Sequence, residues 1–582
     1  MRFYGLLSNA YTAALVGPDG SVDWYPVPRF DSPTVFCRLL DEERGGFFRV
    51  APVRETDQVR QRYLPGTNVL ETTFGTPQGG VVVTDYLPVG RPEVRRLVLA
   101  TTPVAVSLQP AFGYGEANPA YDLTDSGGVF RNPEGNEGLR LDIRGPGTPG
   151  AGRGRRGQWV LPPGEYELVL RYAAHWVQER LELGDGDLPA RETLDREVDF
   201  WRQAAAGVDQ GLERSLLVLK GLTYRTGGGM VAAATTSLPE ALGEERQWDY
   251  RFVWVRDGCY AAEALLATGD VVAARRFLEF LFNLVDIHGK PFNYPFYRVD
   301  GTASLGEREL GWLAGYRGCR PCRVGNAATA QTQLDMEGSV LSVLGRYFDL
   351  TGDLAFLRDY WWAVVSIVNW VSRNWATPDA GLWEFRGRAE RHVHSGVLCW
   401  VALREGSRLA AALGHAAEAA AWDAAAKAVR SEVLREGYSS RLGRFQQGFR
   451  QPALDAALLT LPLYGFIDPR DPRFEGTLSS IERELVQGPF VFRYAEDEFG
   501  TPRHPFLLAS CWLARVYLRR GEEEKAREVL EGMRRGATDL GLFSEHFDQE
   551  RVEPRGNFPQ AFVHAAYLHS LLELRAERPP GV

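Results

Sequence analysis

The strongest constraint on the fold is helical periodicity, which dominates the chain from about residue 209 to its end. Small or apolar side chains cover most of the circumference of many predicted helices, and Ala416–Ala426 is one example. Helices that are apolar over a wide arc pack on more than one side. We therefore predict a double toroid of six inner and six outer helices. The expected helices span 211–225, 257–268, 270–286, 330–350, 353–374, 394–413, 416–435, 452–463, 471–487, 504–520, 522–538 and 558–576.

The preceding part of the chain has a different pattern, with short β-rich segments separated by dense turn residues. Residues 79–87 and 96–102 are β-rich, and residues 165–172 largely alternate polar and apolar side chains. Short strands with regular turns predict a β-sandwich. The predicted fold is mixed and multidomain: an antiparallel β-sandwich at 1–185, a linker helix at 186–208 and an all-α (α/α)6 toroid at 209–582.

Composition narrows the function classes. Of 582 residues, 45% are hydrophobic and 24% charged, values typical of a globular protein. The net charge of −9 argues against a nucleic-acid partner. No run approaches the ~18 apolar residues of a membrane span. The first ten residues lack a secretory pattern and the six cysteines are few and scattered, so we expect a cytoplasmic protein. The oligomeric state stays open.

The sequence predicts neither a cofactor nor a metal. It contains no HExxH, P-loop, GxSxG or credible Rossmann motif. Cys319 and Cys322 form a CxxC pair without the second pair that a structural zinc site needs, and His392 and His394 likewise lack further ligands. The Gly/Pro/Arg-rich stretch 145–157 is predicted to be a mobile loop, because it lacks the GK[ST] signature of a phosphate cradle.

Carboxylates, arginines and aromatic residues are concentrated in the long loops of the helical region. In glycoside hydrolysis one carboxyl group protonates the leaving oxygen and a second activates water, so these loops favour that chemistry. The richest segments are 248–257, 315–326, 381–386 and 541–548, with a weaker one at 492–497. They contain the candidate substrate-binding residues Tyr250, Trp254, Arg256, Asp257, Tyr316, Trp383 and Arg493.

Five sequence segments carry a resemblance to a known family. Over essentially its whole length the chain resembles glycoside hydrolase family 15, the glucoamylase family, in its bacterial two-domain form. That resemblance implies a β-sandwich followed by an (α/α)6 toroid. The matching segments are Asp19–Trp24, Pro28–Pro33, Thr235–Glu240, Trp248–Asp257 and Gly556–Phe562.

The resemblance also implies roles for individual residues. Glu384 matches the general acid of the family and Glu545 matches its general base. Arg256 and Asp257 match the pair that holds the outer hydroxyls of the non-reducing sugar. Tyr250 matches a tyrosine near the reacting oxygen, and Arg493 a sugar-binding arginine. Phe385 departs from the pattern, because fungal members carry a second carboxylate at that position.

The main hypothesis from sequence is an inverting, exo-acting α-glucoside hydrolase that releases β-glucose from α-linked gluco-oligosaccharides. The alternative within the family is α,α-trehalase, with a disaccharide substrate. An inverting phosphorylase is disfavoured by Glu545, since phosphate needs no water-activating carboxylate. A non-catalytic glucan-binding protein is disfavoured because both expected carboxylates are present. Inversion requires Glu384 and Glu545 to face one pocket, with carboxyl groups about 6.5–9.5 Å apart.

Overall fold

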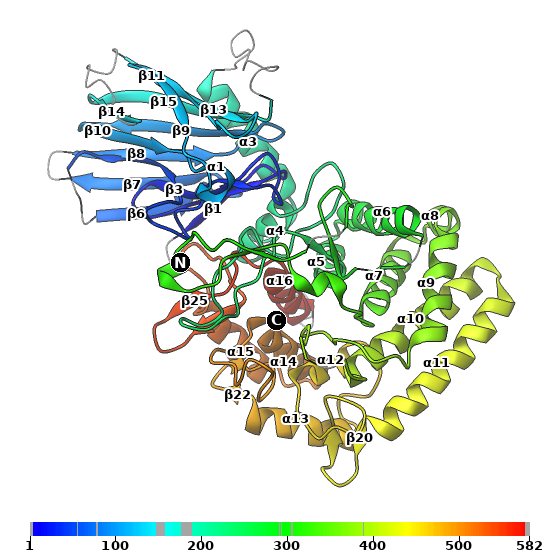
Figure 1. Cartoon of the computed structure of the whole chain (residues 1–582). Helices are drawn as coiled ribbons and strands as arrows, with labels where there is room; N and C mark the ends of the chain where they lie inside the picture. The colour runs from blue at the N-terminus through cyan, green and yellow to red at the C-terminus, as the bar shows by residue number, and fades with distance from the viewer. Residues whose placement is uncertain are drawn as a thin grey trace.

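A computed structural model describes residues 4–576 apart from 55, 57, 77–78, 147–156, 176–188, 290, 293, 304–305 and 388. The described chain has two parts, a strand-rich N-terminal domain and a helical C-terminal domain (Figure 1). Helix α3 (Ala190–Ala204) lies between them in the chain, within the predicted linker. Most of the glycine-rich stretch predicted as a mobile loop lies outside the described residues.

The N-terminal domain contains two antiparallel sheets that enclose one hydrophobic core. The first sheet has the order β1-β2-β3-β5-β10-β14, with β4 paired to β3, and the second has the order β11-β12-β13-β15-β9-β8-β7-β6. Apolar residues of both sheets meet in this core, for example Phe48 and Val106 from one and Val83 and Leu168 from the other. The predicted β-sandwich is therefore confirmed.

The strands are short, as the dense turn residues predict. Turn α1 (Phe112–Gly115) follows the tenth strand. The strands are β1 (Gly5–Ser8), β2 (Ala13–Val16), β3 (Ser21–Pro26), β4 (Thr34–Phe36), β5 (Phe47–Pro52), β6 (Gln58–Tyr63), β7 (Leu70–Thr76), β8 (Gly79–Tyr86), β9 (Glu93–Ala100), β10 (Val104–Gln109), β11 (Ala120–Thr124), β12 (Gly127–Arg131), β13 (Gly138–Arg144), β14 (Gln158–Leu161) and β15 (Gly164–Ala173).

The helical domain is a ring of inner helices surrounded by outer ones, so the predicted toroid is confirmed. Inner helices contact one another in the closed order α5, α7, α10, α12, α14, α16. They are α5 (Val255–Ala267), α7 (Met336–Thr351), α10 (Val393–Leu413), α12 (Thr460–Leu463), α14 (Leu507–Arg519) and α16 (Ala561–Ala576). The outer layer contains α4 (Gln210–Gly221), α6 (Val271–His288), α8 (Leu354–Asp359), α9 (Trp361–Asn374), α11 (Ala416–Glu436), α13 (Pro472–Glu484) and α15 (Glu523–Arg534).

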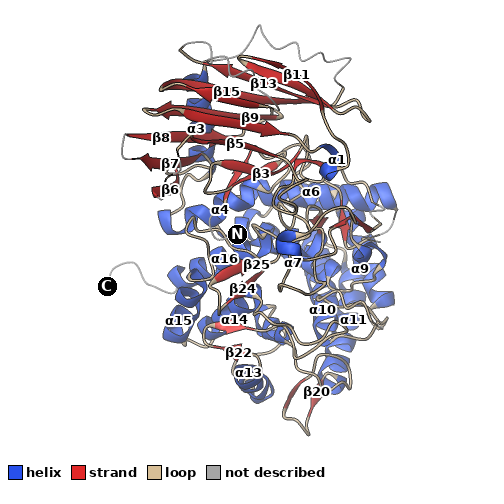
Figure 2. Cartoon of the chain, turned by 60° about the vertical axis from the view of Figure 1, so that its left-hand side comes forward, coloured by secondary structure: helices blue, strands red, loops and turns tan. Residues whose placement is uncertain are grey.

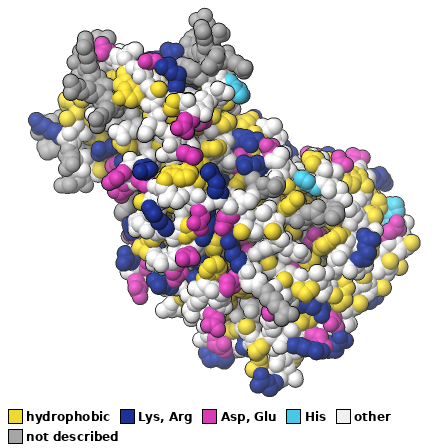
Figure 3. All heavy atoms as spheres, in the orientation of Figure 1, with side chains coloured by type: hydrophobic (Ala, Val, Ile, Leu, Met, Phe, Trp, Pro, Cys, Tyr) yellow, Lys and Arg dark blue, Asp and Glu magenta, His cyan; other side chains and the backbone are white. Residues whose placement is uncertain are grey.

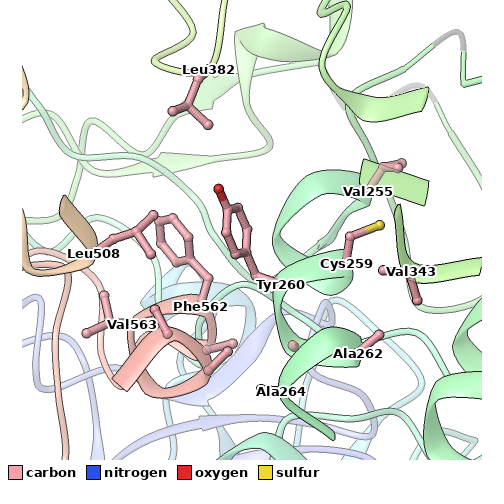
Figure 4. Close-up of a cluster of buried hydrophobic side chains, with 14 of the residues drawn as sticks. Val255, Cys259, Tyr260, Ala262, Ala264, Val343, Leu382, Leu508, Phe562 and Val563 are labelled. Atoms are coloured by element: carbon pink, nitrogen blue, oxygen red, sulfur yellow. The ribbon is translucent and has the colours of Figure 1, made fainter. Parts of the chain in front are cut away.

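Burial separates the two layers. Every residue of α5 from Val255 to Leu266 is buried, because this helix packs on all sides. Outer helix α15 buries Ala526, Val529, Leu530 and Met533, which share one face at helical spacing. Figure 4 shows α5 and α16 meeting inside the ring through apolar side chains. The wide apolar arcs thus mark inner helices such as α5. Ala416–Ala426 is an exception, because it lies on outer helix α11, where only Trp422, Ala426, Val429 and Val433 are buried.

Three predicted helices differ from the observed ones. The predicted helix 353–374 is broken at Tyr360, whose ring packs between helices against Phe282 and Phe356. The predicted helix 452–463 is mostly the 3-10 turn η3 (Ala456–Leu459) followed by the short α12. The predicted helix 330–350 begins only at Met336, because the residues before it turn toward the candidate site described below. Periodicity does not register such contacts between distant segments.

The two domains are joined by hydrogen bonds from large, mostly buried side chains. Trp24 donates from Nε1 to the carbonyl of Ala234 at 2.7 Å, and Arg251 donates from Nη1 to the carbonyl of Ser32 at 2.8 Å. Figure 2 shows the strand layers resting on one side of the helical domain. Because Arg251 directly follows Tyr250, the sandwich supports the segment that carries a candidate site residue.

The surface gives no sign of a single-charge face on the side drawn in Figure 3, where acidic and basic side chains are interspersed. Among the described helices, none combines the length and the apolarity needed to cross a bilayer.

Candidate active site

The candidate site lies where the inner helices begin. Arg256 and Asp257 are in the first turn of α5, Phe506 directly precedes α14, and Gln560 directly precedes α16. Helix N-termini carry positive partial charge, so carboxylates are held favourably at this end of the ring. One cavity is lined here by Tyr250, Trp254, Arg256, Asp257, Leu382, Trp383, Glu384, Arg493, Phe506, Glu545, Gln560 and Phe562.

Glu384 enters this cavity from the loop between α9 and α10. Its φ of +59° lies in the left-handed region, which costs a non-glycine residue of this kind about 1–3 kcal/mol. Trp254 donates from Nε1 to Oε1 at 2.7 Å, and Arg256 donates from Nη2 to the same oxygen at 3.1 Å. Within the described residues no hydrogen bond ends on Oε2. The strained backbone and the two donors hold this carboxyl group in one orientation.

Trp254 is itself held rigidly. It lies at the end of the two-residue strand β16 (Val253–Trp254), which pairs with β17 (Phe296–Tyr297). Its indole stacks on the Phe296 ring with centroids 4.3 Å apart. The hydrogen-bond donor for Glu384 is thus positioned by packing before any ligand arrives.

Glu545 is the second carboxyl group in the cavity and directly precedes strand β24 (His546–Asp548). The hydroxyl of Tyr250 donates to Oε1 of Glu545 at 2.9 Å. Burial raises the pKa of the Glu545 carboxyl well above its usual value, the nearby Glu240 carboxylate raises it further, and Arg493 opposes both. The protonation of Glu545 is therefore controlled by its neighbours.

Tyr250 and Trp254 connect the two carboxyl groups. Their rings pack edge to face with centroids 5.5 Å apart, and each donates a hydrogen bond to one of the two glutamates. Glu384 and Glu545 therefore line the same cavity although they are far apart in the sequence.

Arg493 and Glu240 form a buried ion pair beside Glu545. Nη2 of Arg493 lies 2.6 Å from Oε2 of Glu240, and Nε2 of His546 lies 3.3 Å from the same oxygen. Burial disfavours the charged form of Glu240, but Arg493 and His546 outweigh it and lower the pKa to about 2. Glu240 is thus a fixed negative charge, and burial lowers the pKa of His546.

Nε of Arg256 lies 3.4 Å from Oδ1 of Asp257, and its Nη1 lies 3.2 Å from Oδ2 of Asp335. Oδ1 of Asp257 is buried and has no hydrogen-bond partner among the described residues. Burial raises the pKa of Asp257 to about 7, with Arg256 acting in the opposite direction. Oδ1 is thus ion-paired with Arg256 but accepts no hydrogen bond, so it is suited to accept one from a ligand hydroxyl.

Trp383 forms another wall. Its Nε1 donates to Oδ1 of Asp455 at 2.8 Å, and its ring packs edge to face against Phe506 at 5.2 Å. Asp455 also caps the 3-10 turn through the backbone N–H of Ala457. The irregular fourth inner element, formed by η3 and α12, therefore orients a candidate sugar-contacting ring.

A second small cavity adjoins the first and shares Tyr250, Trp383, Glu384 and Arg493 with it. We call its remaining lining, Glu240, Arg246, Trp248, Asn326, Phe385, Arg386, Tyr494, Asp497, Glu498 and Phe499, the mouth.

Contacts within the mouth close it. Arg246 pairs with Asp497 at 2.6 Å, and the Phe499 ring meets Trp248 at 5.8 Å. The guanidinium of Arg386 lies 3.8 Å above the Trp248 ring. The two cavities hold about 50 Å³ each. An engineered cavity of ~150 Å³ takes up benzene. A sugar ring therefore needs both adjoining spaces together or a movement of these side chains.

Tyr316 lies outside the candidate active site, contrary to the prediction from sequence. It was predicted to contact substrate, yet it lines a different cavity together with Arg38 and Asp41 of the N-terminal domain. The segment around it contains the same residue types as the site loops, but the chain directs it to the domain boundary. The other candidates, Tyr250, Trp254, Arg256, Asp257, Trp383, Glu384, Arg493 and Glu545, all line the candidate active site.

The sequence patterns did not identify several residues of the site. Glu240 ends the segment Thr235–Glu240, so the family resemblance could have identified it. Asp335 and Asp455 lie in stretches that were predicted as helix, which hid their contribution. The mouth residues Trp248 and Phe499 are brought together only by folding.

The cluster with metal-ligand chemistry in the described chain is Glu240, Glu545 and His546, whose ligand atoms lie within 4.8 Å of one another. Arg493 already compensates the charge of Glu240 there.

The six cysteines are buried free thiols, and the CxxC pair lies near the domain boundary. His392 stacks on Phe385 with ring centroids 5.5 Å apart.

Comparison with known proteins identifies the family. The sequence profile of Glycosyl hydrolases family 15 matches residues 208–572. The chain belongs to glycoside hydrolase family 15. A profile described as Trehalase-like, N-terminal, matches residues 2–132. The resemblance seen in the sequence is therefore confirmed, and membership in family 15 makes the protein a glycoside hydrolase.

Relatives cover the whole chain. Trehalase 1 of Sulfolobus acidocaldarius is 40% identical over 578 residues, which covers 99% of each chain. Trehalase 2 of the same organism is 38% identical over 578 residues, covering 98% of this chain and 99% of the relative. A solved bacterial glucoamylase complexed with acarbose has a TM-score of 0.75 at 14% identity, covering 99% of this chain and 94% of the other. That structural match supports the family 15 fold.

Proposed function

We propose that this family 15 enzyme is an inverting α,α-trehalase. The observation that carries the proposal is the placement of Glu384 and Glu545 on one cavity, each with its own hydrogen-bond donor. Trehalose as substrate is supported by the full-length relatives named trehalase at 40% and 38% identity. These findings favour the alternative stated from the sequence over the main hypothesis of a glucoamylase.

In the proposed reaction Glu384 donates a proton to the glycosidic oxygen, while Glu545 accepts a proton from water that attacks the anomeric carbon. The bond between that carbon and the glycosidic oxygen breaks as the bond to water forms. Inversion then yields one β-glucose and one α-glucose. Tyr250 orients the base, and Trp254 with Arg256 orients the acid.

The sugar that is attacked would sit on the wall formed by Arg256 and Asp257. Its hydroxyl groups can donate to Oδ1 of Asp257, which accepts no hydrogen bond within the described chain, and accept from the guanidinium of Arg256. Bonds that involve a charged partner are roughly twice as strong as neutral ones, so this pair suits recognition of a terminal sugar. The face of Trp383 offers an apolar surface beside it.

The leaving sugar would lie in the mouth. Trp248, Arg386 and Phe499 close around it, and the ion pair of Arg246 with Asp497 ties the outer segment down. A mouth closed on this side accommodates a disaccharide more easily than a long chain. Phe385 takes the place of the second fungal carboxylate, and its ring packs against Tyr494 at 5.3 Å.

The purified protein tests the proposal with equal concentrations of trehalose, maltose, isomaltose and maltotriose, read as free glucose. We expect the highest kcat/KM for trehalose. Proton NMR of the first minutes is expected to show α- and β-glucose in equal amounts, before mutarotation. The highest kcat/KM on maltotriose would instead identify the enzyme as a glucoamylase. Two α-glucose molecules would indicate retention. Dependence on inorganic phosphate as nucleophile, with a sugar phosphate as product, would indicate a phosphorylase.

A further inference from the structure

A separate cavity, which we call the deep cavity, lies further along the inner helices and holds about 190 Å³, and its lining includes the solvent-exposed side chains of Arg346 and Asp349. Its walls come from later turns of the helices that begin at the candidate active site. Glu263 follows Arg256 by seven residues on α5, which corresponds to about 10 Å along the helix axis. The cavity is therefore distinct from the one that holds Glu384 and Glu545.

The size of this deep cavity matches one sugar ring. A cavity of ~150 Å³ takes up benzene, a single six-membered ring, whereas drug-sized ligands occupy roughly 300–1,000 Å³. At about 190 Å³ the deep cavity has room for one pyranose and not for an oligosaccharide.

The lining of the deep cavity carries acids and bases in equal number, several of them also paired with Arg408 or Glu573 outside the lining. Its lining contains the acids Glu263, Asp349 and Glu405 and the bases Arg346, Arg404 and Arg515. A wall of one sign would favour an ion, but equal numbers of carboxylates and guanidiniums favour a neutral ligand with many hydroxyl groups. Each hydroxyl can donate to a carboxylate and accept from a guanidinium.

One of these charges, Arg346, is not fully engaged by the protein. The nearest carboxylate oxygen to Arg346 is on Glu263, and the distance of 3.9 Å is too long for a hydrogen bond. The side chain of Arg346 is 38% exposed. By contrast Arg404 pairs with Glu405 at 2.8 Å. Arg346 is thus the charge most available to a ligand. Oε1 of the neighbouring Glu263 accepts a hydrogen bond from the Ser342 hydroxyl at 2.7 Å, which leaves its Oε2 for a ligand.

Aromatic groups complete the lining. Trp512 is fully buried, and within the described residues its Nε1 donor has no acceptor. A buried donor without a partner is costly, and a ligand oxygen would satisfy it. Tyr260 projects from α5 beside Phe562 (Figure 4). Its hydroxyl lies near that of Tyr464.

We propose that the deep cavity is a second carbohydrate site that binds one neutral sugar ring. Glu263 and Arg346 hold its hydroxyl groups, and Trp512 donates to one of its oxygens. The Trp512 ring lies 5.9 Å from Trp383 and 6.3 Å from Tyr260, so it contacts the wall of each cavity. The site is a binding site without catalytic groups of its own, and it does not depend on the identity of the substrate proposed above.

Glucose is the probe for this site. A crystal structure of the wild-type protein soaked in glucose is expected to show a sugar ring between Glu263, Arg346 and Trp512. Equilibrium dialysis with labelled glucose is expected to show one more bound glucose per chain in the wild type than in Arg346→Ala. Arg358→Ala, an exposed change on outer helix α8, is the matched control and keeps the wild-type number.

Glu263→Gln serves as a second variant, because it keeps the shape of the side chain if Arg346→Ala fails to fold. It is expected to weaken the deep site at least tenfold. A soaked crystal with only water in the cavity, or sulfate binding there in preference to glucose, would overturn the proposal. An inactive enzyme that still binds glucose in this cavity would count against the proposed trehalase reaction alone.

Discussion

Trp254 donates a hydrogen bond from Nε1 to Oε1 of Glu384 at 2.7 Å, and this bond joins the start of an inner helix to a strained loop residue. The indole cannot accept a proton, so it orients the carboxyl group without taking part in proton transfer. Oε1 of Glu384 also accepts a hydrogen bond from Nη2 of Arg256. The arrangement suits a fixed proton donor.

Glu384→Gln tests the proposed acid. Loss of a general acid typically costs 10²–10⁴-fold in rate, so trehalose hydrolysis is expected to fall by about that factor. α-Glucosyl fluoride, whose leaving group needs little protonation, is expected to be hydrolysed much closer to the wild-type rate. Steady-state kinetics on both substrates measure this, with exposed Glu528→Gln on α15 as control. Equal losses on both substrates would contradict the assignment.

The acidic limb of the pH profile tests the pair of Glu240 and Glu545. Glu545 must be ionised to accept a proton, and burial together with Glu240 raises its pKa. Activity is therefore expected to be lost as the pH falls through that raised pKa. Glu240→Gln removes the neighbouring negative charge and frees Arg493 to approach Glu545. The acidic limb of log kcat/KM is expected to move to lower pH, and an unchanged or higher midpoint would refute the coupling.

Asp257→Asn tests recognition of the terminal sugar. The variant keeps the shape of the side chain but loses the charge that can accept from a hydroxyl group. Catalytic efficiency is expected to fall at least tenfold, equivalent to ~1.4 kcal/mol of transition-state stabilisation. The melting temperature is expected to change little, as in the exposed control Asp286→Asn. Unchanged kinetics with a lower melting temperature would assign Asp257 a purely structural role.

Phe499→Ala tests the mouth. Phe499 is partly exposed and contacts Trp248, so its removal opens the side on which the leaving sugar is expected. The ratio of kcat/KM for maltotriose to that for trehalose is expected to rise about tenfold, or ~1.4 kcal/mol. The control is Val272→Ala, which also truncates an exposed apolar side chain but lies on outer helix α6. A constant ratio would mean that the mouth does not limit substrate length.

Arg251→Gln tests the support that the β-sandwich gives the site. Arg251 and Asp249 form a buried pair at 2.7 Å, and the same guanidinium donates to Ser32 across the domain boundary. Removing one partner of a buried pair costs about 3–5 kcal/mol because the other charge is left unpaired. We expect the helical domain to unfold at a lower urea concentration, and tryptophan fluorescence measures this midpoint. A midpoint within error of the exposed control Arg358→Gln would contradict the supporting role.

The two-domain architecture and both proposed catalytic carboxylates were predictable from the sequence alone. Alternating and helical periodicities depend on local burial, so they separate the sandwich from the toroid. The wide apolar arcs of helices such as α5 and α10 indicate packing on several sides. Glu384 and Glu545 were identified through short family motifs that surround them.

Tertiary structure decided which of the loop residues meet. Tyr316 and Trp254 lie in segments of similar composition, yet only Trp254 reaches the cavity of Glu384. Glu240 gains its role from Arg493 and His546, which are distant in sequence. The mouth, the position of Asp257 beside Arg256 and the deep cavity beside Trp512 also arise from packing between helices. Periodicity reports which face of a segment is buried, whereas contacts between segments depend on how the whole ring closes.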